Sequence, residues 1–272
     1  MSPAETNDAG AGRGEFRAVS PAKTVRTALI AGATFEIRAV QYVEIDGLAV
    51  FEGDIVLGTA AEVERRTEAA QFHPERGLPQ SAVVVVGPGV RWPNHVVPFE
   101  IDPALPNQQR VTDAVAHWES RTQMRFPRRA GQPDYVRFVP GNGCSSFVGR
   151  RGGRQDITLG GNCSTGNAIH EIGHAVGLWH EQSREDRDRF VTVRFENVIP
   201  GFEHNFDQHI ADGDDAGPYD YGSIMHYPRD AFSRNGLDTI TPTDPNAVIG
   251  QRIGLSPRDI DAIRAIFDPA PA

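Results

Sequence analysis

Long apolar runs, an excess of basic residues and an ordinary leader are all missing from this sequence. No apolar run approaches the roughly 18 residues that cross a bilayer, so we expect no membrane span. Acidic residues outnumber basic ones by 36 to 27, and the net charge of −9 argues against a nucleic-acid partner, which needs a basic surface. The start, Met1-Ser2-Pro3-Ala4-Glu5, has no basic region followed by an apolar core, so no ordinary signal peptide is visible.

What the sequence does contain is a cluster of metal-ligand residues between His170 and Glu181. Four residues along a helix is a rotation of about 400°, so His170 and His174 leave the same face one turn apart and can share a tetrahedral zinc ion. Glu171 lies too near the first ligand to serve as a third, but it can reach a water held on the metal. This is the HExxH pattern of zinc peptidases, in which the Glu is the general base.

His180 can join the two helical histidines only if the helix ends before it, because ten more helical residues would carry it about 15 Å from His170. Gly177 allows this ending, since glycine accepts the left-handed backbone that terminates many helices. Three histidines leave one position of the zinc ion open, which distinguishes a catalytic zinc from a structural one. The alternative, an amphipathic helix with ordinary histidines, does not account for the glycine and the third histidine at these offsets.

A second motif, from Tyr221 to Tyr227, places Met225 where metzincin peptidases have a methionine-containing turn beneath the metal. With this motif, the chain resembles the astacin family of zinc metalloendopeptidases. The resemblance covers roughly residues 80 to 268 and rests on three stretches, which are His170 to Asp188, Ser223 to Tyr227, and Ile249 to Arg252 with the helix that follows. It implies an α+β metzincin fold of two subdomains, with a twisted mixed sheet, a backing helix and the zinc helix. It also implies one catalytic Zn²⁺ and hydrolysis of peptide bonds in protein or peptide substrates.

The resemblance assigns roles to four further side chains. Tyr227 resembles the tyrosine that ligates zinc at rest and then hydrogen-bonds the reaction intermediate. Glu181, the residue that astacins have after the third histidine, resembles the buried acid that receives the new amino terminus after activation. Met225 is the structural floor of the site, and Arg252 is expected to line the pocket for the residue after the scissile bond and to favour acidic residues there.

The N-terminal part contains the short motif Phe51-Glu52-Gly53-Asp54, within a stretch from Thr34 to Gly58 that alternates in strand fashion. By itself the motif predicts a hairpin turn. Astacin propeptides carry Phe-x-Gly-Asp, whose aspartate binds zinc, so the resemblance implies that Asp54 takes the fourth position. The reactive water would then be displaced, Glu171 would have nothing to deprotonate, and the chain would be a latent zymogen.

These observations divide the chain into three parts. Residues 1–33, rich in Ala, Gly and small polar residues, are expected to be poorly ordered, whereas 34–81 form an inhibitory propeptide and 82–272 the peptidase domain. Activation then needs a cut between Arg76 and Val83, made by another protease or by the enzyme itself. This boundary rests on aligning Arg91-Trp92-Pro93-Asn94 with the start of mature astacins.

Residue patterns predict the main elements of the peptidase part. Strands are expected at Val96 to Ile101 and Tyr135 to Val139, with a helix between them that is capped by Asn107. A short strand from Ile157 to Leu159 is expected to lead into the zinc helix and to be the edge along which substrate lies. The last helix should run from its cap, Ser256, to Phe267. The first of the helices should bury a stripe formed by Val111, Val115, Trp118 and Thr122.

The two cysteines, Cys144 and Cys163, flank the segment before the zinc helix and match one of the two astacin disulfides. A bridge between them would close a loop of about twenty residues and stabilise the fold by roughly 3 kcal/mol in the chain-entropy model. A pair of buried thiols in a reducing cytosol is the alternative. The second family disulfide is missing, so we expect packing to hold the C-terminal helix.

We interpret the chain as a secreted or extracellular, monomeric astacin-like zinc metalloendopeptidase made as a zymogen. His170, His174 and His180 are its expected metal ligands and Glu171 its base. One alternative is a catalytically silent, zinc-bearing binding protein on a metzincin fold, whose propeptide never leaves. The other is a zinc hydrolase that acts on a non-peptide amide or ester.

Overall fold

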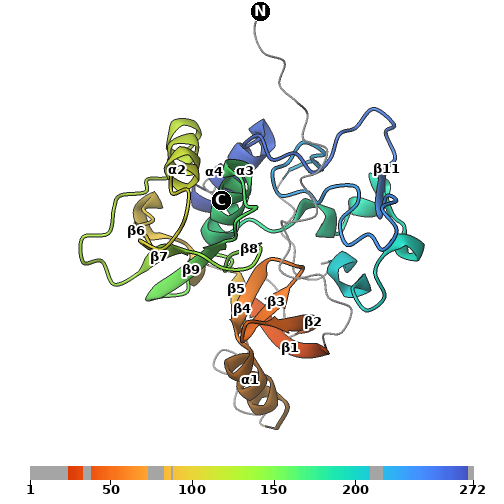
Figure 1. The fold of residues 1–272 in the computed structure, drawn as a ribbon, viewed down its shortest axis with the longest axis horizontal. Helices are drawn as coiled ribbons and strands as arrows, with labels where there is room; N and C mark the ends of the chain where they lie inside the picture. The colour runs from red at the N-terminus through yellow and green to blue at the C-terminus, as the bar shows by residue number, and fades with distance from the viewer. Residues whose placement is uncertain (1–23, 33–37, 73–82, 87, 209–216, 269–272) are drawn as a thin grey trace, which may run out of the picture.

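The computed structural model of the chain describes residues 24–32, 38–72, 83–86, 88–208 and 217–268. Its elements are both helices and strands in several sheets, so the predicted α+β class is confirmed. In Figure 1 the N-terminal sheet and helix α1 (Ala60–Phe72) lie at the bottom and helix α3 (Thr165–Val176) lies near the centre. Helix α2 (Gln109–Arg121) lies with the second sheet on the left. None of the described helices is both long and apolar enough to span a membrane.

The N-terminal part is a five-stranded sheet in the order β4-β3-β2-β1-β5. Helix α1 lies between β4 and β5 in the sequence. Neighbouring strands are antiparallel except β1 and β5, which are parallel. Its apolar side chains form a separate core that includes Ile30, Tyr42 and Phe51. The elements are β1 (Val25–Gly32), β2 (Arg38–Ile45), β3 (Leu48–Phe51), β4 (Ile55–Thr59), α1 (Ala60–Phe72) and β5 (Val83–Val86).

Two predicted boundaries differ from this arrangement. Residues 25–32, assigned above to a poorly ordered segment of residues 1–33, form strand β1, with Ala28 and Ile30 buried. Residues 83–86, assigned to the peptidase domain, pair with β1 in the N-terminal sheet. The four valines from Val83 to Val86 are typical of a strand, but both strands find their partners far along the sequence, so local composition did not reveal that they pair. Residues 1–23 and residues 73–82, which include most of the predicted cleavage segment from Arg76 to Val83, lie outside the described part of the chain.

Two tight turns shape the N-terminal sheet. Asp46 and Gly47, with φ of 52° and 78°, join β2 to β3, as expected for an Asp-Gly hairpin. Glu52, Gly53 and Asp54 join β3 to β4, and both Glu52 and Gly53 have positive φ. The hairpin that the Phe-x-Gly-Asp motif predicts is therefore present.

The second sheet has the order β6-β7-β9-β8, with β6, β7 and β9 parallel and β8 antiparallel to β9. Helices α2 and α3 pack against each other, and the main apolar core contains side chains from both, including Trp118 and Ile169. The bounds are β6 (Phe99–Ile101), α2 (Gln109–Arg121), β7 (Tyr135–Val139), β8 (Cys144–Ser145), β9 (Arg154–Leu159) and α3 (Thr165–Val176).

Three predictions for this sheet and helix need correction. The predicted strand at residues 96–101 is shorter, because Val96 makes only an isolated bridge with Arg125. Helix α2 begins after Gln108, whereas Asn107 has φ of 49° and lies outside the helix. The strand predicted as the edge, β9, is flanked by β7 and β8, so the edge on that side of the sheet is β8. The predicted stripe of α2 is confirmed at Val111, Val115 and Trp118, which are buried. Its fourth residue, Thr122, is the C-cap of the helix and is only partly buried.

After α3 the chain forms short 3₁₀ turns, a two-stranded sheet and a final helix. Helix α4 begins at its predicted cap Ser256, which makes a capping box with Asp259. Ile263 is buried in the main core, and the Asp259 carboxylate accepts hydrogen bonds from the Ser223 hydroxyl and the Ile224 amide. The helix is thus held by polar contacts as well as by the predicted packing. The remaining elements are η4 (Pro88–Val90), η5 (Pro93–His95), η6 (Glu181–Ser183), η7 (Arg187–Arg189), β10 (Val191–Val193), η8 (Phe195–Asn197), η9 (Glu203–Phe206), β11 (Ile240–Pro242) and α4 (Pro257–Phe267).

Candidate metal centre

Helix α3 presents two of the predicted ligands, and its ends are set by local chemistry. Ser164 caps the first turn through a capping box with Asn167. At the other end Gly177 adopts φ of 116°, which ends the helix and lets the chain turn back. His170 and His174 leave the helix side by side, and the turn brings His180 to them, with ring centroids 4.7 to 5.4 Å apart. The predicted helix end and the approach of the third histidine are confirmed.

Each imidazole is oriented by a hydrogen bond from its Nδ1–H group. His170 donates to the carbonyl of Ile224 at 2.8 Å and His174 to the carbonyl of Leu178 at 2.9 Å. His180 donates to the Glu52 carboxylate at 2.7 Å. Because these hydrogen bonds keep the proton of each ring on Nδ1, the Nε2 lone pairs are free to face a common point.

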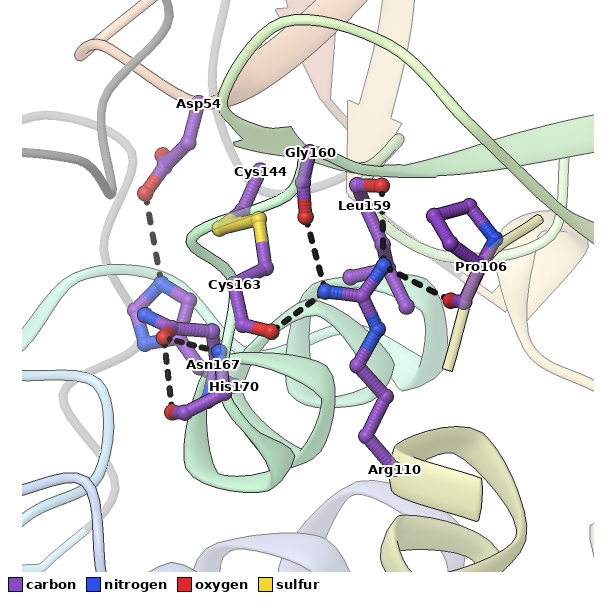
Figure 2. Close-up of a disulfide and its surroundings, with 10 residues drawn as sticks. Asp54, Pro106, Arg110, Cys144, Leu159, Gly160, Cys163, Asn167 and His170 are labelled. Carbon is purple, nitrogen blue, oxygen red and sulfur yellow. Dashed lines mark hydrogen bonds and ion pairs between the residues drawn. A yellow bond between two sulfur atoms is a disulfide. The ribbon is translucent and has the colours of Figure 1, made fainter. Parts of the chain in front are cut away.

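Asp54 faces the same point from the β3–β4 turn. Its carboxylate oxygens lie 3.3 Å from Nε2 of His170, 3.6 Å from Nε2 of His174 and 3.2 Å from Nε2 of His180. All four side chains are fully or almost fully buried. Figure 2 shows the Asp54 carboxylate pointing at the ring of His170.

The four side chains fit a zinc ion. The three Nε2 atoms and both Asp54 oxygens have no hydrogen-bond partner among the described residues, although they are buried. Such orphaned groups are costly unless a cation joins them. Tetrahedral zinc with ligand distances of about 2.1 Å has ligand atoms about 3.4 Å apart, close to the separations of 3.2 to 3.6 Å seen between Asp54 and the histidines.

The titratable groups of the centre are strongly perturbed by burial and by one another. Burial, with help from the nearby Arg252, lowers the pKa of His170 to about 3, so this ring is neutral. Burial lowers the pKa of His180 as well, but Asp54 and Glu52 outweigh it and raise the pKa to about 9. Burial would raise the pKa of Asp54, yet the neighbouring imidazoles, above all His180, hold it well below its usual range. Zinc bound by the imidazoles would compete with protonation of His180.

The methionine-containing turn packs against helix α3. Met225 is buried, and a Cβ atom added at Gly173 would lie 2.7 Å from its sulfur, so the turn touches α3 where the helix has no side chain. The Met225 carbonyl accepts a hydrogen bond from the amide of Glu181 at 3.2 Å. The turn and the segment that carries His180 are thus joined directly.

Three other predicted residues lie around the centre. Tyr227 is buried, its ring centroid lies 4.7 Å from that of His180, and its hydroxyl donates to the Glu52 carbonyl at 2.5 Å. Burial raises the pKa of Glu181 to about 8, and its carboxylate accepts a hydrogen bond from the amide of Asp220. Arg252 donates from Nη1 to the carbonyls of Ile224, His226 and Gln251, so it braces the Met225 turn. Its part in substrate preference stays a prediction.

A disulfide and a buried arginine hold the loop before α3. Cys144 and Cys163 are bridged, in agreement with the predicted pair. Arg110, which is 3% exposed on α2, donates to the carbonyls of Gly160 and Cys163 through Nη1. Figure 2 shows its guanidinium group surrounded by carbonyl oxygens on one side of the bridge, with Leu159 and Pro106 as the further acceptors.

Sequence reasoning missed two residues of the site. Glu52 stands at the variable position of the Phe-x-Gly-Asp motif, and Ser183 follows the third histidine by three residues. Both are buried, and the Ser183 hydroxyl donates to the Glu52 carboxylate at 2.7 Å. No local pattern could have paired them, because they lie 131 residues apart.

Comparison with known proteins agrees with this geometry. The sequence model of the astacin peptidase family matches residues 85–268. Blastula protease 10 of Paracentrotus lividus is 38% identical over 232 residues, which cover 80% of this chain and 38% of that protein. Zinc metalloproteinase nas-6 of Caenorhabditis elegans is 43% identical over 183 residues, which cover 65% of this chain and 53% of that protein.

A solved structure is similar as well. High choriolytic enzyme 1, a hatching enzyme zinc-protease from Oryzias latipes, aligns with a TM-score of 0.61 and 40% identity over 65% of this chain and 92% of that one. The chain spans between 38% and 53% of the length of the curated relatives named above. With the three-histidine centre and the Met225 turn in place, these matches show that the chain belongs to the astacin family of metzincin zinc peptidases.

Proposed function

We propose that the chain is a zinc endopeptidase held latent by its own N-terminal segment. His170, His174 and His180 would hold one zinc ion, and Asp54 would occupy the remaining position. The observation that carries this proposal is that Asp54 faces the three histidines while the backbone of residues 54–56 pairs with Ser146. The Val56 amide donates to the Ser146 carbonyl at 2.7 Å, and the Ser146 amide donates to the Asp54 carbonyl at 2.9 Å.

This pairing supports a peptide-binding edge. Ser146 directly follows edge strand β8, and it forms a parallel bridge with Ile55. Adding an extended segment to an exposed sheet edge is a common way of binding peptides, because backbone groups provide affinity for any sequence. A substrate would use the same backbone groups once the N-terminal segment has left.

The catalytic roles follow from the chain's own groups. When bound, zinc supplies Lewis-acid activation of a water molecule and of the scissile carbonyl. Glu171 follows the first ligand on α3 and is fully buried. It would accept the proton of the attacking water and pass it to the leaving amine. The Tyr227 hydroxyl, which now donates to the Glu52 carbonyl, would be released to donate to the carbonyl oxygen that gains negative charge.

The N-terminal sheet is the proposed inhibitory unit. Its described residues before the proposed cut are 25–32 and 38–72, which contribute Asp54 to the centre, whereas β5 lies after the cut. The match with blastula protease 10 covers 80% of the chain and so extends beyond residues 85–268 into this unit. Activation would cut between Arg76 and Val83, and the new amino terminus would reach the buried carboxyl of Glu181. The disulfide supports secretion, because such bonds persist in oxidising compartments.

One experiment tests both parts of the proposal. Zinc content and degradation of an unfolded protein substrate are measured on the intact chain and after limited proteolysis. We expect one zinc per chain in both samples but hydrolysis only after trimming, with the new amino terminus located by sequencing. The Glu171→Ala variant should keep its zinc and hydrolyse nothing. A zinc-loaded, trimmed chain that leaves every peptide intact would instead support a silent binding protein.

A further inference from the structure

The three histidines of the centre differ in where their outer nitrogens find a partner. The Nδ1–H groups of His170 and His174 donate to the carbonyls of Ile224 and Leu178, both within the peptidase part. His180 donates instead to Glu52, which lies 128 residues earlier in the N-terminal sheet. The third ligand is therefore oriented by the segment that the proposed activation removes.

Glu52 is built into this position by several contacts. Its side chain is fully buried, and its second carboxylate oxygen accepts the Ser183 hydroxyl at 2.7 Å. Its carbonyl accepts the Tyr227 hydroxyl. Its backbone has φ of 45°, a left-handed conformation that residues other than glycine adopt rarely. A tight turn does not need a buried carboxylate, whose desolvation is unfavourable without such partners.

A carboxylate on the outer nitrogen of a metal-bound histidine has a known physical effect. It fixes the tautomer and orientation of the ring and makes the ligating nitrogen more basic. Here the two acids of one turn act on both sides of the same ring, with Asp54 3.2 Å from Nε2 and Glu52 2.7 Å from Nδ1 of His180. The turn therefore holds both the ligand and the metal position.

We propose that Glu52 is a positioning residue for His180, through which the N-terminal segment strengthens metal binding by the latent chain. This inference rests on the proposed metal centre, but it does not require that the trimmed protein hydrolyses peptides. It follows that the segment has two effects on the metal. Asp54 closes the reactive position, while Glu52 helps the chain acquire and keep its ion before activation.

The test measures zinc affinity of the full chain by competition with a chromogenic chelator. We expect Glu52→Ala to weaken zinc binding by about 10-fold to 100-fold, the usual effect of losing such a partner. Glu52→Gln retains an acceptor for the Nδ1–H group but removes the charge, so it should recover part of this loss. The control is Glu68→Ala, which removes an exposed acid of α1 and should stay within about 3-fold of the parent chain.

A purely structural role predicts different results. In that case Glu52→Ala would lower the thermal stability of the metal-free chain but leave zinc affinity and the spectrum of the cobalt-substituted site unchanged. Equal zinc affinity of a folded Glu52→Ala chain would overturn the proposal. If that variant does not fold, Glu52→Gln decides, because its zinc affinity should be at least about 3-fold weaker and an unchanged value contradicts the inference.

Discussion

Gly166 lies in the first turn of α3, where the helix touches the backbone of Arg252. A Cβ atom added at Gly166 would overlap the Arg252 carbonyl oxygen and lie 2.7 Å from the Arg252 Cβ. The obstacle is backbone and not the end of a flexible side chain, so the segment around Arg252 would have to move. Intrinsic helix propensity acts in the opposite direction, because alanine favours a helix over glycine by about 1 kcal/mol.

The two effects predict opposite signs for the Gly166→Ala variant. Overpacking a well-packed contact destabilises by typically about 1–3 kcal/mol, and here a fixed backbone places the effect at the upper end. After the propensity gain, we expect the free energy of unfolding to fall by about 1–2 kcal/mol or more. The matched control is Gly161→Ala, where an added Cβ has no atom within 4 Å. Urea unfolding of both variants measures the difference.

The displacement should also reach the metal. Arg252 Nη1 donates to the Ile224 carbonyl, which is also the acceptor for His170. We therefore expect Gly166→Ala to bind zinc more weakly than Gly161→Ala. A Gly166→Ala chain that is as stable as the parent, or more stable, would show that the helix and the backbone of Arg252 are not in close contact.

Three further predictions concern the loop, the buried acid and the N-terminal segment. Arg110→Met should remove the charged donor for four carbonyls and so lower the free energy of unfolding by about 3 kcal/mol. In a thermal scan this corresponds to a melting temperature about 6–12 °C lower. The control Arg121→Met changes an exposed residue of the same helix and should have little effect in the same scan. Burial raises the pKa of Glu181 from 4.5 to about 8, so the folded chain holds a proton that the unfolded chain releases, and stability should fall as pH rises between these values. Glu181→Gln should flatten that decline in unfolding curves measured from about pH 5 to 8, and an unchanged slope would exclude this acid as its source. The ring of Trp179 packs edge-on against Phe51, with ring centroids 6.4 Å apart. Trimming of the N-terminal segment should therefore expose Trp179 and shift the tryptophan emission to the red. The same red shift in a Trp179→Phe chain would show that the shift arises from another tryptophan.

The parts of the site that could be predicted carry local signals. The spacing of His170 and His174 depends only on helix geometry, and Gly177 marks the end of that helix by its own backbone preference. Ser256 likewise marks the start of α4, because the capping box that it forms with Asp259 lies within four residues. In each case the physics acts over one or two turns, so the sequence pattern is sufficient.

The parts that could not be predicted depend on contacts between distant residues. Strand β1 has little sequence signal, and it is stabilised by pairing with β2 and β5. Asn107 has the side chain of a good cap, yet its backbone is left-handed and the helix begins one residue later than a cap there would allow. Glu52 meets His180 only because the hairpin folds onto the peptidase part. Tertiary packing, and not local preference, determines these three positions.

Anomalous diffraction at the zinc edge, on crystals of the full chain, would locate the metal directly. We expect one zinc ion with four ligand atoms, the Nε2 atoms of His170, His174 and His180 and one carboxylate oxygen of Asp54. An ion bound elsewhere, or a centre in which Asp54 points away while the three rings hold the metal, would contradict this expectation.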